Sequence, residues 1–271
     1  MNLNLYMKDF KRYRISLIGW CVIISMIIFV TMSIYPILME SDAIENLKMF
    51  FENSFMKTIM AAFGASVDSI TNILGYYVGN NSKNALIFGN IFSILLSSRI
   101  ISREENEKTA EFLLSKPLTR YNIFISKFLA YLSMLLIFNI VLVLSGYISL
   151  EIFKNEDYSY KAFFIISFYS FLSMLTFGMI GMLISLLFKR GKAIMGISIG
   201  IIISCYFIFA ISNITESIDV FGYISPFKFV NSDVLNPNYG IEWWRVSYFM
   251  VLSTISFVIA YIKYKNKDIL I

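Results

Sequence analysis

The residues best suited to specific chemistry in this sequence are the carboxylates of one polar segment, 101–120. Glu104, Glu107 and Glu111 have the i, i+3 and i+7 spacing that places side chains on one face of a helix. The sequence contains no histidine, which excludes zinc proteases of the H-E-x-x-H type, Ser/His dyads and most metal-transfer sites. We therefore predict no catalytic residue in this chain, and we interpret the acidic row as a binding surface.

The other residues that could hold a cofactor or a metal ion are poorly placed for it. Cys21 and Cys205 both lie in apolar runs, where cysteine usually acts as a small hydrophobic residue, and their spacing fits neither a metal site nor a disulfide framework. The basic stretch 189–192 (KRGK) lacks the upstream Gly and the following Ser or Thr of a phosphate-binding loop. We predict no cofactor, no metal ion and no ATP hydrolysis in this chain.

Composition places most of the chain in lipid. Hydrophobic residues make up 58% of the 271 residues and charged residues only 15%, against about 25% in an average soluble domain. The mean hydropathy is +0.70. The net charge of +5 does not indicate nucleic-acid binding, because the basic residues lie at the ends of apolar runs rather than on one face.

Six apolar stretches are long enough to cross a bilayer as helices, which requires about 20 residues at 1.5 Å per residue. They are residues 15–38, 84–101, 123–150, 162–188, 193–213 and 243–263. The first stretch lies too far behind its basic residues, and is too long, to be a cleaved signal peptide. We predict an all-α membrane protein with one transmembrane domain over residues 1–271.

Residues 55–79 are ambiguous, because they are apolar but contain Lys57, Asp68 and Asn72. With six spans and a cytoplasmic N-terminus, 16 of the 23 basic residues fall inside, as the positive-inside rule requires. These residues are Lys8, Lys11, Arg12, Arg14, Arg99, Arg103, Lys108, Lys116, Arg120, Lys127, Lys189, Arg190, Lys192, Lys263, Lys265 and Lys267. A seventh span would put part of this set outside, so we predict that 55–79 forms helices along the outer interface.

The polar segment is predicted to form a helix over 104–116 that lies parallel to the membrane on the cytosolic side. Ser102 and Glu105 fit a capping box at its start. Pro117 disfavours helix at the residue before it and so ends the element, and Thr119 is positioned to cap the next span. The alternative interpretation is a solvated linker with incidental charge.

Residues 104–127 resemble the signature of ABC-2 type transporter permeases, in which a Glu and polar residues precede Gly-Thr, Leu-Leu-Ser, a Pro, an Arg and a Lys. The matching residues are Glu104, Thr109, Leu113, Leu114, Ser115, Pro117, Arg120 and Lys127. Lys108 departs from the pattern, because the commoner form has Gly there and Lys keeps a helix continuous. The ending Tyr-Lys-Asn-Lys-Asp-Ile at 264–269 also resembles the end of such permeases.

This resemblance implies that 104–116 is a coupling helix that fits a groove on a separate ABC ATPase subunit, where ATP and Mg²⁺ are bound. The acidic face would meet basic or polar groups, and Phe112 and Leu113 would fill an apolar pocket. The expected contact residues are Glu104, Glu105, Glu107, Lys108, Thr109, Glu111, Phe112, Leu113, Leu114, Pro117 and Arg120. The resemblance further implies a second permease protomer, identical or not.

The expected function is therefore a permease subunit of an ATP-driven exporter of a drug, an antimicrobial peptide or a lipid-like substrate. The expected location is the bacterial cytoplasmic membrane, among its lipids, with both termini cytoplasmic. The alternative is a membrane scaffold or sensor coupled to an ATPase without transport.

Two weaker features of the sequence are the pair Gly178 and Gly181 and the pair Gly196 and Gly200, which fit helix packing. Asn139, deep in the third span, fits either a path or a hydrogen bond between helices.

Overall fold

The computed structural model describes residues 2–40, 72–107, 109, 118–188, 191–214 and 219–266. All regular structure in these ranges is helical. The long helices are α1 (Leu3–Glu40), α6 (Lys83–Asn106), α8 (Arg120–Phe153), α9 (Tyr160–Leu187), α10 (Gly191–Ser212) and α12 (Trp243–Asn266). Six helices in this described part are long and apolar enough to cross a membrane. The predicted all-helical class and six-span layout are therefore confirmed.

The second span begins earlier than predicted. Asn72 caps the short helix α5 (Ile73–Tyr76), its side-chain oxygen accepting hydrogen bonds from the backbone N–H groups of residues 74 and 75. A π-helical turn, η1 (Tyr77–Ser82), follows and leads directly into α6. Residues 73–79 thus belong to the span and not to an interfacial helix, because side chains such as Tyr77 are buried in the bundle. Residues 55–71 of that prediction lie outside the described residues.

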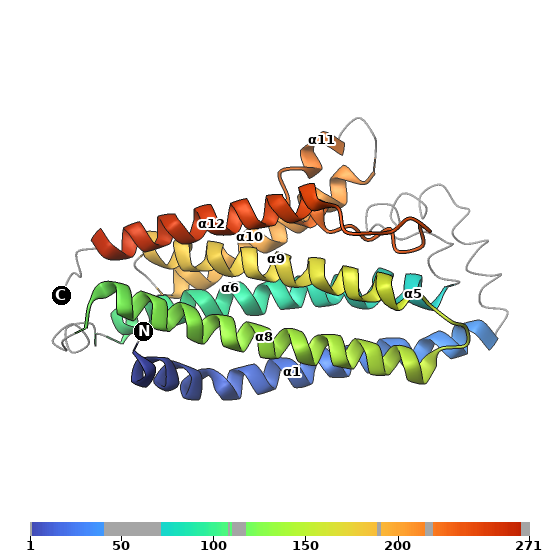
Figure 1. Ribbon diagram of the computed structural model, residues 1–271, viewed down its shortest axis with the longest axis horizontal. Coiled ribbons are helices and arrows are strands. Elements are labelled where there is room, and N and C mark those ends of the chain that lie inside the picture. The colour runs from blue at the N-terminus through green and yellow to red at the C-terminus, as the bar shows by residue number, and fades with distance from the viewer. Residues whose placement is uncertain are drawn as a thin grey trace.

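The helices form one elongated bundle with both ends of the chain on the same side, at the left of Figure 1. We call this side the terminal end and the opposite side the distal end. Helix α1 finishes at the distal end, where α5 also begins; there the hydroxyl of Tyr76 donates a hydrogen bond to the carbonyl oxygen of Thr31. The chain between α1 and α5 thus starts and ends on one side, as the six-span layout requires.

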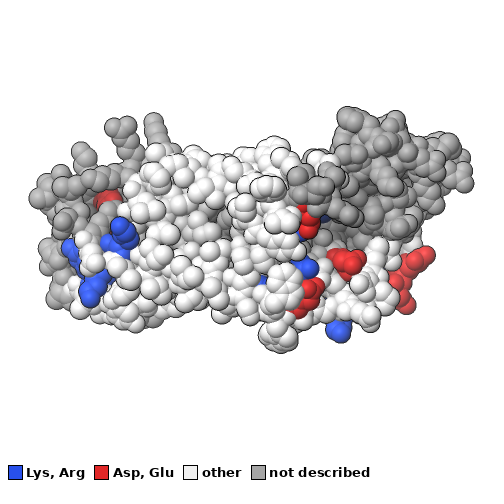
Figure 2. All heavy atoms as spheres, turned by 90° about the horizontal axis from the view of Figure 1, so that it is seen from above, with Lys and Arg blue, Asp and Glu red and all other residues white. Residues whose placement is uncertain are grey.

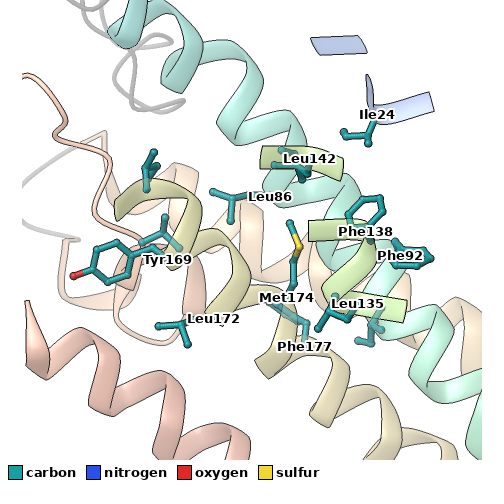
Figure 3. Close-up of a cluster of buried hydrophobic side chains, with 14 of the residues drawn as sticks. Ile24, Leu86, Phe92, Leu135, Phe138, Leu142, Tyr169, Leu172, Met174 and Phe177 are labelled. Carbon is teal, nitrogen blue, oxygen red and sulfur yellow. The ribbon is translucent and has the colours of Figure 1, made fainter. Parts of the chain in front are cut away.

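Helices α6 and α9 form the interior of the bundle, and most of their residues are buried, whereas α1, α10 and α12 bury about a quarter of their apolar windows or less. Figure 3 shows how the core is assembled: Ile24 from α1, Phe92 from α6, Phe138 from α8 and Phe177 from α9 all belong to it. Phe92 and Phe138 pack with their ring centroids 4.5 Å apart. The outward faces of α1, α10 and α12 remain apolar, as helices in lipid require.

Small and hydroxyl-bearing residues join the interior helices. Ser93 of α6 is within 2.8 Å of the Tyr131 hydroxyl of α8, and the Asn90 amide donates to Ser173 of α9 over 3.1 Å. Lipid offers no hydrophobic driving force between helices, so such hydrogen bonds and close packing hold a membrane bundle together. A Cβ on Gly181 would lie 2.6 Å from the carbonyl oxygen of Ile94, so α9 needs glycine there to approach α6.

Charge separates along the bundle. Figure 2 shows mainly basic residues on this face at the terminal end, both acidic and basic residues toward the distal end, and an uncharged surface between them. Helices α1, with 38 residues, and α8, with 34, are about 57 and 51 Å long at 1.5 Å per residue. Both exceed the roughly 30 Å of hydrocarbon, so their charged ends reach beyond the apolar layer.

Gly181 and Gly196, one from each predicted packing pair, are expected to respond differently to substitution by alanine. Gly181→Ala should lower the thermal midpoint, by an amount equivalent to about 1–3 kcal/mol, because the new methyl group overpacks a backbone contact. Gly196→Ala is the matched control, since no heavy atom lies within 4 Å of its Cβ position. Alanine favours helix over glycine by about 1 kcal/mol, so the control should not lower the midpoint. Equal midpoints in purified detergent samples would contradict the close approach of α9 to α6.

Candidate functional site

Helix α6 continues beyond its predicted end at residue 101 and finishes at Asn106. The predicted capping box at Ser102 and Glu105 is wrong, because Ser102 lies inside the helix and its hydroxyl donates to the carbonyl oxygen of Ser98 over 2.8 Å. At the helix end, the backbone N–H of Thr109 donates to the carbonyl oxygen of Glu104 over 2.8 Å. The polar segment therefore starts as the last turn of a span.

This last turn contains a buried ion pair. The carboxylate of Glu104 in α6 pairs with the ammonium of Lys127 in α8, and the Lys127 side chain is 0% exposed. The same ammonium also donates to the carbonyl oxygen of Ile100 over 2.6 Å. An ammonium this deep in a membrane bundle requires a counter-charge and hydrogen-bond acceptors, and α6 supplies both.

A second pair extends the network to α1. The Arg103 guanidinium binds Asp9, whose side chain is also completely buried. At the rim, Arg12 of α1 pairs with Glu107, which is 36% exposed. Three cations therefore face three carboxylates, and the network is neutral. Asp9 Oδ2 and Glu104 Oε1 are buried and have no hydrogen-bond partner within the described ranges, so removing either cation would leave its carboxylate poorly satisfied.

The start of α8 is fixed to α12 and to the N-terminal residues. Thr119 caps α8 as predicted, accepting a hydrogen bond from the backbone N–H of Asn122 over 3.2 Å. Arg120 donates to the carbonyl oxygen of Lys265 over 2.9 Å, at the end of α12, where helix carbonyls lack partners. Ser126 accepts a hydrogen bond from the N–H of Asn2 over 2.8 Å. Both ends of the segment between α6 and α8 are thus anchored in one assembly.

Comparison with known protein families identifies the family of this chain. The family described as ABC-2 family transporter protein matches residues 3–269. This chain belongs to that family. No curated protein sequence matches it. The ABC-2 family forms the membrane component of ABC transporters, so the chain is a multi-pass membrane permease and its family works with an ABC ATPase.

The first and last residues of the ABC-2 signature are Glu104 and Lys127. These two residues form the buried ion pair described above. Sequence analysis placed Glu104 on a surface facing the ATPase, but its side chain is only 9% exposed because Lys127 and α8 cover it. Charge reversal at Glu104 would bring two ammonium groups together and disturb the fold, so it cannot test ATPase docking. Arg120 contacts the end of α12, and its predicted contact with an ATPase remains a prediction.

The remaining predicted contact residues divide into two groups. Glu105 is partly buried, whereas Glu107 and Thr109 are exposed at the terminal end. The others lie outside the described residues; they are Lys108, Glu111, Phe112, Leu113, Leu114 and Pro117. The predicted helix over 104–116 is therefore described only in its first residues, of which 104–106 form the end of α6.

The sequence did not indicate that Asp9 pairs with Arg103. It indicated Lys127 as a cytoplasmic basic residue and as part of a motif, but not as a buried partner of Glu104. A usable signal was present, because Lys127 stands in an apolar run and an ionisable residue inside a span needs a partner. Asn139 was left open between a path and a hydrogen bond, and its Oδ1 has no partner in the described part of the chain. Within those residues no group of three His, Cys, Asp or Glu side chains could hold a metal ion.

The buried pair predicts a specific pattern of stability. Lys127→Met should lower stability by about 3–5 kcal/mol, because it leaves the Glu104 carboxylate buried without its cation. The double variant Lys127→Met/Glu104→Leu should recover most of that loss. Arg12→Gln is the control, since it breaks an exposed pair worth about 1 kcal/mol or less. Thermal midpoints of the four proteins in detergent check this, and a double variant no more stable than Lys127→Met would argue against the pair.

Proposed function

We propose that this chain is the permease subunit of an ATP-driven exporter in a bacterial cytoplasmic membrane. Its substrate would be a drug, an antimicrobial peptide or a lipid-like molecule, moved outward by a dimer of permease protomers. A separate ATPase subunit would bind ATP and Mg²⁺. Membership of the ABC-2 family supports this proposal. The observation that carries it is the buried Glu104–Lys127 pair, which joins the two flanks of the segment expected to contact the ATPase.

The pair gives a physical route for the coupling. When nucleotide binding moves the ATPase, the segment between α6 and α8 would be displaced with it. Because Glu104 and Lys127 hold these helices together, α6 and α8 would move as one body. Asp9 would transmit the movement to α1 through Arg103, and the end of α12 would follow through Arg120. Such rigid-body motion of packed helices is a common way to switch a binding site between two states.

The ATPase contact is tested at Thr109, which is exposed, and at Phe112, which lies outside the described residues. Thr109→Lys and Phe112→Ala should each reduce co-purification of a co-expressed partner ATPase by at least about tenfold, as expected for loss of about 1.4 kcal/mol. Resistance or transport should fall in the same strains. The thermal midpoint of the permease should not change, because Thr109 is exposed.

The control for this experiment is Asp157→Asn, an exposed residue at the distal end, which should behave as wild type. If both segment variants bind the ATPase and transport like wild type, the segment is only a linker. If transport is lost while the ATPase still binds, the segment transmits force without determining affinity, and the predicted docking contact is wrong.

Orientation is tested by labelling of single cysteines in a chain whose Cys21 and Cys205 are replaced by Ala. Asn106→Cys lies exposed at the terminal end and Asn236→Cys lies exposed at the distal end. Because basic residues gather at the terminal end, that end should be cytoplasmic. A membrane-impermeant maleimide should therefore label Asn236→Cys in intact cells and Asn106→Cys only in inverted vesicles. The opposite pattern would refute cytoplasmic termini.

A further inference from the structure

Lys83 is a basic residue at the distal end that takes no part in the ion pairs or in the coupling route described above. Its Nζ is buried and has no hydrogen-bond partner among the residues that the structure describes. The neighbouring cations differ, since Lys154, Lys228 and Arg245 each pair with a carboxylate, namely Glu151, Asp219 and Glu242. An ammonium has three donors and no acceptor, and leaving it buried without a partner costs considerable free energy. The burial of the Lys83 ammonium without a carboxylate partner therefore requires a physical explanation.

The surroundings of Lys83 form a small apolar pocket. Val78 and Leu86 line it from η1 and α6, and Tyr206 of α10 and Phe227 of η3 (Pro226–Phe229) line it from the facing side. The pocket is partly open, and its enclosed space is about 20 Å³, which holds about one water-sized group. The enclosed part can therefore admit a single anionic oxygen beside the ammonium, and the rest of a larger ligand would extend through the open side.

The local backbone is also unusual. Residues 77–82, directly before Lys83, form the π-helical turn η1. π-Helical turns inside helices are rare and frequently occur at functional sites. Lys83 lies about 15 Å along the axis from Ile73, at 1.5 Å per residue, so it belongs to the span and not to a loop. Its pocket lies where this span meets the distal connection between α10 and α12, which supplies Phe227, Val230 and Ser232.

We propose that the Lys83 pocket binds an anionic amphiphile: a phosphate or carboxylate oxygen enters beside the ammonium, and the acyl chain lies along the apolar wall. Charge complementarity selects the head group, and the Val78, Leu86 and Phe227 side chains favour an apolar tail. A free inorganic anion would satisfy the charge but would leave the apolar wall uncovered. This binding requires no ATP and no ATPase, so it is independent of the function proposed above.

The experiment uses the purified full chain in a neutral maltoside detergent, titrated with phosphatidylglycerol, with phosphatidylcholine or with inorganic phosphate. The thermal midpoint reports binding, because a ligand of the folded state raises it. Phosphatidylglycerol should raise the wild-type midpoint, and the other two additives should not. Lys83→Met should abolish this rise. Without lipid, its midpoint should equal or exceed that of wild type, because the variant removes an unpaired buried charge.

Lys154→Met is the matched control, because it removes the same charge at the same end from a lysine that already has a carboxylate partner. It should respond to phosphatidylglycerol as wild type does. An equal response of Lys83→Met would overturn the proposal, and an equal effect of inorganic phosphate would show a free-anion site instead. A lipid-free midpoint of Lys83→Met well below wild type would show that Lys83 has a structural partner, which also overturns the proposal.

Discussion

A charge inside a membrane bundle must be neutralised by a partner, and Lys127 meets this requirement through Glu104. The pair fixes the axial position of α6 against α8, because the same ammonium also binds the carbonyl oxygen of Ile100 over 2.6 Å. A shift of one helix turn, about 5.4 Å, would break both contacts. Helices that could otherwise slide in lipid are thereby held in one register at the terminal end.

The other spans depend on that register. Asp9 can bind Arg103 only if α1 stands beside the last turn of α6, and Arg120 reaches the end of α12 only if α8 begins where it does. Toward the middle of the bundle, contact is maintained by close packing instead, since α9 approaches α6 through Gly181. Four spans are thus joined by charged side chains at one end, while α9 is joined to α6 by close packing and by hydrogen bonds such as that from Asn90 to Ser173. A displacement of the segment after α6 would be shared among the helices rather than absorbed locally.

The sequence alone was sufficient to predict the helical class and the six spans, because length and hydrophobicity determine what crosses a bilayer. It failed where polar residues are buried. Hydropathy treats Arg103 and Glu104 as solvent-exposed, although partners on α1 and α8 neutralise them and let α6 continue to Asn106. The i, i+3, i+7 row of carboxylates has the same spacing whether it faces solvent or a buried lysine. Only the packing of distant segments distinguishes the two cases.

The two ends of the bundle use buried charge differently. At the terminal end each buried cation has a carboxylate partner, so the network is neutral and resists rearrangement. At the distal end Lys83 has no such partner in the part of the chain that the structure describes, and it directly follows a π-helical turn. A network of paired charges favours a single arrangement, whereas an unpaired cation leaves interaction energy available to a ligand of opposite charge. A bundle driven from one end and binding amphiphiles near the other would need this asymmetry, because the driven end must be stiff and the binding end must be incomplete until a ligand arrives.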